Sequence, residues 1–265
     1  TLPLLIIDAG TGLLGLALSL LQAHPVSQFD ILLCISHAHW DHISGFPAFV
    51  ELLGPRANIK VVSLKRPPQS YSIENSLRWQ QSRCPQTWEQ IQAQIEFAEL
   101  SDRQSLSFQN FQVSTAQLNH PGYSSGFLVQ AEEGQLAYIS DIAPVCDILL
   151  AEPLYEDEQP SQLRQRLYDN EMWLANQAQT VIYDTFFTDP DFQGRPHWGH
   201  STLERALSTC SSNLVERLFL FHHNSEYSDE FQWTRIAGVS TSMEIRLAQE
   251  RVPFLIQMRS KIRGV

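Results

Sequence analysis

Three histidines and one aspartate stand within six residues of this chain, in the segment His37-Ala38-His39-Trp40-Asp41-His42. Imidazole nitrogens and carboxylate oxygens are ligands that zinc, manganese and iron bind. In an extended chain His37 and His39 project to the same side and can hold one ion, whereas the adjacent Asp41 and His42 can turn towards a second. The spacing therefore predicts two metal half-sites on one loop.

The element before this segment predicts where the loop lies. Residues 30–36 read Asp-Ile-Leu-Leu-Cys-Ile-Ser, an apolar run with the length and composition of a buried parallel strand. The ligands then follow the carboxyl end of a strand, which is where open α/β architectures carry their chemistry.

Five further motifs accompany the histidine-rich loop along the chain. They are Ile6-Ile7-Asp8-Ala9-Gly10-Thr11-Gly12, Leu118-Asn119-His120-Pro121-Gly122, Tyr138-Ile139-Ser140-Asp141, Trp198-Gly199-His200-Ser201-Thr202 and Leu220-Phe221-His222-His223. In this order, and together with His-x-His-x-Asp-His, they resemble the metallo-β-lactamase superfamily of binuclear metallohydrolases. The resemblance covers most of the chain.

The resemblance implies two sets of metal ligands. They are His37, His39 and His120 for the first ion, and Asp41, His42 and His222 for the second. The neighbouring His223 is the alternative to His222. Asp141 is expected to bridge the ions, although a carboxylate there could also cap the turn before Ala143-Pro144. Two divalent ions held about 3.5–4 Å apart can bind a bridging hydroxide, which is the expected nucleophile. Zinc is the first choice, with manganese or iron as alternatives.

His200 has a different predicted role. Ser201-Thr202-Leu203-Glu204 reads as a capping box, so a helix is expected to begin at Ser201, with His200 beside its positive end. The resemblance implies that Asp184 orients His200 as a general acid, although Asp184 could equally cap a turn. Asp41, His200 and Asp184 are thus the expected catalytic residues, and Asp8 is expected to hydrogen-bond to the backbone of the ligand loop.

The coarse pattern of apolar residues predicts an α/β fold. Strands are expected at 4–7, 31–36, 60–64, 106–118, 126–130, 135–140, 148–151, 180–184, 214–221 and 253–257, and helices at 13–22, 43–53, 160–178, 201–210 and 229–250. The resemblance implies an αββα sandwich of two mixed β-sheets with helices on the outer faces. We expect a single domain over 1–265 with a helical insertion at about 65–100, made of helices 73–81 and 87–98. The insertion is expected to cap the sheet edge or to cover the site as a lid.

The composition of the chain indicates where the protein is expected in the cell and which partners it is expected to bind. With 265 residues and 43% apolar content the chain can bury a substantial core. A net charge of -11 opposes attraction to extended nucleic acid. Its four cysteines form no Cys-x-x-Cys pair, which favours a reducing cytoplasm. The apolar run 13–21 is about half the ~20 residues of a membrane span and has no basic segment before it, so neither a membrane anchor nor a signal peptide is expected. A homodimer is compatible with the sequence.

The motifs around His120, His200 and His222 are closest to the phosphodiesterase branch, which includes ribonuclease Z and cyclic-phosphate diesterases. The tRNA-processing members use a basic arm, whereas the 65–100 segment is neutral, with four lysine or arginine residues against four glutamates. A small or cyclic phosphodiester is therefore the first predicted substrate, and an RNA 3′-end nuclease is the alternative. A non-hydrolytic diiron, redox or metal-binding domain is an alternative of another class. In the redox relatives an acidic residue replaces the second histidine of the motif, which is His39 here.

Overall fold

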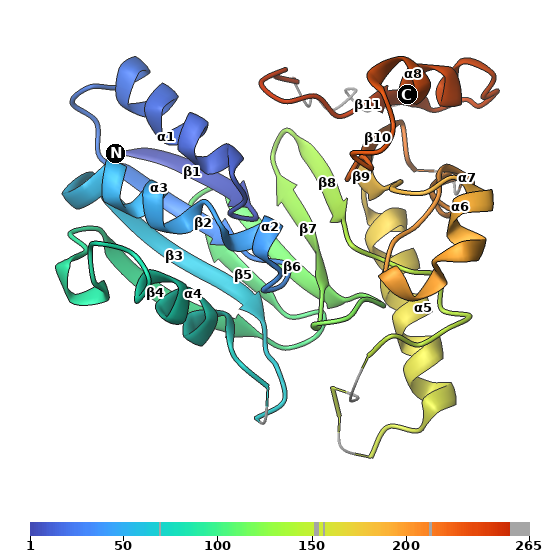
Figure 1. Cartoon of the computed structure of the whole chain (residues 1–265), viewed down its shortest axis with the longest axis horizontal. Coiled ribbons are helices and arrows are strands. Elements are labelled where there is room, and N and C mark those ends of the chain that lie inside the picture. Colours follow the sequence, from blue (N-terminus) through green and yellow to red (C-terminus); the bar gives the residue numbers. More distant parts are fainter. Residues whose placement is uncertain (69, 151–153, 156, 212–213, 255–265) are drawn as a thin grey trace, which may run out of the picture.

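The strand β2 (Phe29–Cys34) has apolar side chains on both of its faces, so both faces of its sheet are covered. Phe29, Ile31 and Leu33 pack beneath helices, whereas Leu32 and Cys34 pack against a second sheet. The computed structural model describes the chain except for residues 69, 151–153, 156, 212–213 and 255–265. It shows two sheets face to face with helices on both outer faces (Figure 1).

The first half of the chain builds a parallel sheet. Its strands, in spatial order, are β1 (Leu2–Ile7), β2, β3 (Ala57–Leu64) and β4 (Gln94–Leu100). The connections contain α1 (Gly12–Ala23), α2 (Trp40–Ile43), α3 (Phe46–Leu53), α4 (Ile73–Gln81) and the short 3₁₀ turns η1 (Gly54–Arg56) and η2 (Trp88–Gln90). Helices α1, α3 and α4 cover the outer face of this sheet, where a large apolar cluster is buried.

The second half builds a mixed sheet. Its antiparallel strands are β5 (Ser105–Phe108), β6 (Phe111–Gln117), β7 (Ser125–Ala131) and β8 (Gly134–Ile139). The parallel strands β9 (Thr180–Asp184), β10 (Arg217–Phe221) and β11 (Glu244–Leu247) continue from β8. The helical elements are α5 (Pro160–Gln177), α6 (Asp189–Gly194), η3 (Pro196–Trp198), α7 (Leu203–Cys210) and α8 (Asp229–Ala237).

Three buried apolar clusters confirm the predicted αββα sandwich. One lies under the helices of the first sheet, one lies between the second sheet and the helices α5 and α7, and the third fills the space between the sheets. The first sheet is entirely parallel, so only the second is mixed. None of the described helices combines the length and apolar content needed to cross a membrane.

The prediction of a second helix at 87–98 is wrong. Gln94–Leu100 is strand β4, which pairs in parallel with β3 and completes the first sheet. Ile91, Ile95 and Ala98 match a helical spacing, but Ile95 and Phe97 also alternate with polar residues, and backbone pairing with β3 selects the strand. The segment 65–100 is therefore helical only in part, at α4 and η2.

Other predicted elements also differ from the structure. The strand expected over 106–118 is a hairpin of β5 and β6, and the helix expected over 43–53 is divided into α2 and α3. The helix expected over 229–250 ends at Ala237, and Glu244–Leu247 pairs with β10 as β11; Gly238, which ends the helix, is a poor helix former. The strand expected at 148–151 is irregular over 148–150, with Leu149 N donating to Asn119 Oδ1, and residue 151 lies outside the described residues. Pro253 and Phe254 form no strand, and 255–257 lie outside the described residues.

Candidate metal centre

The predicted site residues come from both sheets and meet at one edge of the sandwich. The histidine-rich loop follows β2, His120 follows β6, Asp141 follows β8 and His222 follows β10. β6, β8 and β10 run in the same direction in the second sheet, and their carboxyl ends meet that of β2 from the first sheet at this edge (Figure 1). Parallel strands are the reason that residues far apart in sequence converge here.

The first cluster brings together His37, His39 and His120. His37 Nε2 lies 2.9 Å and His120 Nε2 lies 3.2 Å from His39 Nδ1. His120 Nδ1 donates to the carbonyl oxygen of Gly199 over 2.7 Å, so its Nε2 carries a lone pair. Ser36 Oγ donates to Asp8 and lies 3.0 Å from His37 Nδ1, so it can accept from that nitrogen and leave His37 Nε2 unprotonated. Ring nitrogens with lone pairs thus converge on one point.

Burial keeps these three imidazoles in the neutral form that metals bind. It lowers the pKa of His37 well below its ordinary value and the pKa of His120 to about 4, and it lowers that of His39 as well. His37 and His120 are almost fully buried, whereas His39 is exposed. The cluster therefore has a closed inner side and an open outer side.

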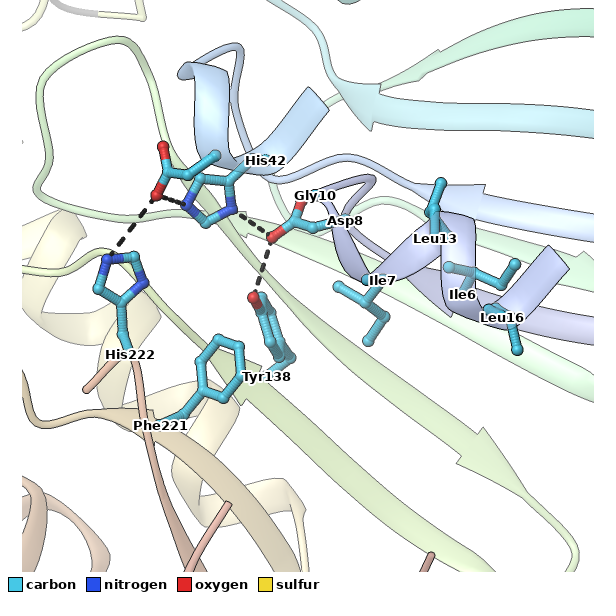
Figure 2. A pocket seen from close by; sticks show the side chains of 12 residues that line it. Ile6, Ile7, Asp8, Gly10, Leu13, Leu16, His42, Tyr138, Phe221 and His222 are labelled. Atoms are coloured by element: carbon cyan, nitrogen blue, oxygen red, sulfur yellow. Dashed lines mark hydrogen bonds and ion pairs between the residues drawn. The ribbon is translucent and has the colours of Figure 1, made fainter. Parts of the chain in front are cut away.

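The second cluster contains Asp41, His42, Asp141 and His222. His42 Nε2 lies 3.2 Å from both Asp41 Oδ2 and Asp141 Oδ2, and His222 Nδ1 lies 3.4 Å from Asp141 Oδ2. The rings of His42 and His222 are parallel, with centroids 5.7 Å apart. Figure 2 shows both rings turned towards one carboxylate group, and His222 Nε2 lies 3.9 Å from Asp41 Oδ2.

This second set of donors fits a cation. His42 Nε2 is buried and makes no hydrogen bond of acceptable geometry, although two carboxylate oxygens face it. Burial alone would lower the pKa of His42, but the carboxylates of Asp8, Asp141 and Asp41 outweigh burial and raise it. The adjacent His42 imidazole lowers the pKa of Asp41 to about 2. A position that attracts positive charge this strongly, lined by nitrogen and oxygen donors, suits a divalent ion.

Asp8 supports the ligand loop as predicted, and it does more. Asp8 Oδ1 accepts from the backbone N–H of Ser36 over 2.7 Å. Asp8 Oδ2 accepts from Ser36 Oγ, from Tyr138 Oη over 2.9 Å and from His42 Nδ1 over 2.7 Å (Figure 2). Asp8 therefore fixes the orientation of His42, because a hydrogen bond to one ring nitrogen aims the other.

The backbone is left-handed at three site residues. Asp8, Asp141 and His222 have φ values of 61°, 57° and 56°. Asp8 and His222 directly follow a strand, and Asp141 stands two residues after the end of one. Non-glycine residues adopt this conformation rarely and at a cost. Apolar periodicity carries no signal of such a turn, so the sequence could not have revealed it.

His200 and Asp184 form the predicted pair. His200 Nδ1 donates to Asp184 Oδ2 over 2.8 Å, and Asp184 also accepts from the N–H groups of Ile142 and Phe186. Burial lowers the pKa of His200, but Asp184 outweighs burial and raises it. The ring of Phe186 stacks on His200 at 4.5 Å, a contact that the sequence did not suggest.

The helix after His200 begins later than predicted. Thr202 is the N-cap residue, and its hydroxyl accepts from Arg205 N, so α7 starts at Leu203 rather than at Ser201. His200 therefore lies two residues before the cap, and its partners are side chains rather than the first turn of the helix. Gly199 has a φ of 88°, and a Cβ atom there would overlap His120 Nδ1. His200 also groups with His120 and Asp141 as a third set of donors.

The alternative ligand His223 points away from both clusters. Its Nε2 lies 3.1 Å from the carbonyl oxygen of Ala248. Beside the second cluster a cavity of about 290 Å³ opens between α1, β1 and β10, with Leu13, Leu16 and Phe221 in its walls (Figure 2). The site thus has an apolar side next to Asp41 and His222.

Comparison with known proteins identifies the family. The model of the beta-lactamase superfamily domain matches residues 4–223. No curated protein matches the chain by sequence. Similar solved structures include the metallo-beta-lactamase fold protein YhfI from Bacillus subtilis (16% identity, 93% of this chain and 84% of that chain, TM-score 0.63). The short form of human tRNase Z (17%, 96% and 88%, 0.63) and unliganded yeast PDE1 (14%, 83% and 66%, 0.53) are also similar.

At these identities the solved structures establish the fold alone, whereas the family model spans most of the sequence. The order of motifs, the αββα sandwich and the family match agree. The chain therefore belongs to the beta-lactamase superfamily and has the metallo-β-lactamase fold.

Proposed function

We propose that this protein is a binuclear metal-dependent phosphodiesterase that hydrolyses a small or cyclic phosphodiester. The position of Asp141 carries the proposal. Its Oδ1 lies 3.9 Å from His37 Nε2 and from His120 Nε2, whereas its Oδ2 lies 3.2 Å from His42 Nε2. A carboxylate that faces two ligand sets suits two dications about 3.5–4 Å apart. Membership of a superfamily made up mostly of metal-dependent hydrolases supports this reading.

The proposed ligands divide as the two clusters do. His37, His39 and His120 would hold the first ion, Asp41, His42 and His222 the second, and Asp141 both. Zinc suits the nitrogen-rich first set, and manganese or iron would also suit the mixed second set. When bound, two divalent ions would neutralise charge on the phosphoryl oxygens and activate the attacking water. His39 and Asp41 are the exposed ligands, so they lie on the side that is open to an arriving substrate.

We assign proton transfer to His200. Its Nδ1–H is held by Asp184, so Nε2 is the atom that can give a proton to the leaving group. Asp184 raises the pKa of His200 and so favours the protonated form that a general acid needs. Phe186 covers one face of the ring and keeps it in place.

The net charge of the chain and its neutral 65–100 segment favour a small substrate. At -11 the protein would repel a long polyanion at low salt. The RNA 3′-end nuclease is the second candidate, because one similar fold is that of a tRNase Z. The similar fold of CmlA beta-hydroxylase (11% identity, TM-score 0.51) means that fold alone does not separate hydrolysis from redox chemistry.

The test is an assay of metal-loaded protein with bis(p-nitrophenyl) phosphate, cyclic nucleotides and pre-tRNA. We expect hydrolysis of the small diesters and none of the pre-tRNA. His222→Ala should abolish activity, and His223→Ala is the matched control, because His223 contacts the Ala248 carbonyl instead. Cleavage of pre-tRNA alone would favour the nuclease, and oxygen uptake by iron-loaded protein without hydrolysis would contradict the proposal.

A further inference from the structure

Arg66 is a half-buried cation that has no anionic partner among the described residues. It follows β3, and its Nη1 donates to the carbonyl oxygen of Tyr71 over 3.2 Å. Its Nε and Nη2 atoms are buried and make no hydrogen bond, and no described carboxylate forms an ion pair with it. A guanidinium group offers five N–H donors, so most of this binding capacity is unused.

Leaving Arg66 in this state costs free energy. Burial lowers its pKa to about 10, and the more distant Glu99 and Tyr123 offset this only in part. The group is therefore still charged at neutral pH. An unpaired buried charge destabilises a fold, which is the expected state of a binding residue before its ligand arrives.

Arg66 lies at the same edge as the metal clusters. Cys34 of β2 pairs with Val62 of β3, and Ile35 N donates to Val62 O, so the ligand loop and the 65–68 segment leave adjacent strands at the same level. Tyr123, whose phenol acts on Arg66, is three residues after His120. A guanidinium in this position can reach part of a molecule bound at the metals.

Arg66 is one of the residues that line a pocket of about 820 Å³. Lys65, Arg66, Pro67 and Pro68 line one part of it, and residues of α5 and of the segments before it line the rest. Two of its carboxylates, Asp102 and Glu158, are already paired with Arg166, at 3.1 Å and 2.6 Å.

The described residues that line this pocket include more cations than carboxylates without an ion-pair partner. Among the described lining residues, Lys65 and Arg66 are the cations without an ion-pair partner, and Asp157 is the carboxylate without one. Both of these cations line the same pocket, so together they give it a positive side, which suits a phosphate group.

We propose that Lys65 and Arg66 form a subsite for a second phosphate group of the substrate, separate from the diester that reacts at the metals. This inference rests on the proposed function, and it restricts the class of substrate. The preferred substrate would be a small diester that also carries a phosphate monoester, and a simple cyclic mononucleotide would leave the subsite unfilled.

The kinetic test compares two substrates with the same scissile bond. They are thymidine 5′-(p-nitrophenyl phosphate) and its 3′-phosphorylated form. The wild type should prefer the second by about 10- to 100-fold in kcat/KM, the usual scale for hydrogen bonds to a charged group. Arg66→Gln should remove this preference mainly through KM, so that the variant hydrolyses the two substrates with about equal kcat/KM. Arg83→Gln is the matched control, because Arg83 lies over Trp79 outside this pocket.

A binding measurement separates this inference from the proposed function. Thymidine 3′,5′-bisphosphate should raise the Tm of metal-loaded wild type more than thymidine 5′-monophosphate does, and Arg66→Gln should respond equally to both. This holds even if neither diester is hydrolysed, an outcome that would overturn only the phosphodiesterase proposal.

The stability of the variant gives a further check. Without nucleotide, Arg66→Gln should have an unchanged or higher Tm, since it removes an unpaired buried charge. A lower Tm together with an undiminished response to the bisphosphate would make Arg66 a structural residue and overturn the subsite. Equal responses of the wild type to the two nucleotides would overturn it as well.

Discussion

Two buried polar clusters in this protein are built in opposite ways. Glu171 of α5 is fully buried and accepts hydrogen bonds from Tyr183 Oη and Thr209 Oγ1, both over 2.6 Å, and from Arg205 Nε over 3.1 Å. Its other oxygen accepts from Arg205 Nη2. At the metal centre, by contrast, acceptor atoms face one another, and His42 Nε2 has no hydrogen bond.

The two clusters also differ in backbone conformation, which is regular in the first and left-handed at several residues of the second. Glu171, Tyr183, Arg205 and Thr209 stand within regular helices and a strand. Asp8, Asp141 and His222 stand in left-handed turns. A cluster whose polar atoms are all satisfied ties elements together, whereas a cluster of converging acceptors in strained turns is suited to hold a cation. Variants of each cluster test this difference.

The largest effect is expected from Asp141→Ala. Because each oxygen of Asp141 faces a different cluster, its loss should empty both sites and reduce activity by at least roughly 10⁴-fold, the scale for loss of an essential catalytic unit. His120→Ala should mainly empty the first site. Metal content per chain, measured by mass spectrometry after gel filtration, checks both. Equal partial losses from the two variants would contradict the bridging role.

His200→Ala should lower kcat by about 10²–10⁴-fold while both ions stay bound. The loss should shrink for a p-nitrophenyl ester, because nitrophenolate leaves without a proton, and Asp184→Asn should act in the same direction more weakly. Rates with activated and unactivated diesters, together with metal content, provide the measurement. If the variant lost an ion, His200 would instead be a ligand in the third donor set, with His120 and Asp141.

Asp8→Asn should weaken binding of the second ion about 10- to 100-fold, the usual effect of a residue that orients a metal ligand. The amide changes the hydrogen bonds that Asp8 makes with Ser36, Tyr138 and His42. Competition with a chelator of known affinity measures the change. Asp30→Asn, near the opposite end of β2, is the control and should leave the affinity unchanged.

Glu171→Gln should leave activity nearly unchanged and reduce stability instead. It leaves Arg205 without its counter-charge, which costs about 2–4 kcal/mol because Arg205 is partly exposed, and the Tm should fall by roughly 5–10 °C. Thermal unfolding of the metal-loaded protein checks this, with the exposed Asp169→Asn on the same helix as control. Loss of metal at unchanged Tm would mean that the two clusters are not independent.

The sequence could predict those site residues that lie in short motifs. His37 through His42 and β9 with Asp184 at its end could be placed because an apolar strand and its terminal residue are adjacent in sequence. The alternation of strands and helices predicted an α/β fold, and the family resemblance implied the two-sheet sandwich.

The remaining features depend on contacts that the sequence does not encode locally. β4 and β11 each match two periodicities, and only pairing with β3 and β10 selects the strand. The hydrogen bond from Tyr138 to Asp8 spans 130 residues, and no pattern in the chain connects them. Likewise, only the folded structure shows that Arg66 Nε and Nη2 are buried without a hydrogen bond.

Anomalous diffraction from crystals of zinc-loaded protein tests the central claim most directly. We expect two peaks about 3.5–4 Å apart, one among His37, His39 and His120 and one among Asp41, His42 and His222, with Asp141 between them. A single peak at full zinc occupancy, or a second peak on His200 rather than on His42, would contradict the binuclear centre described here.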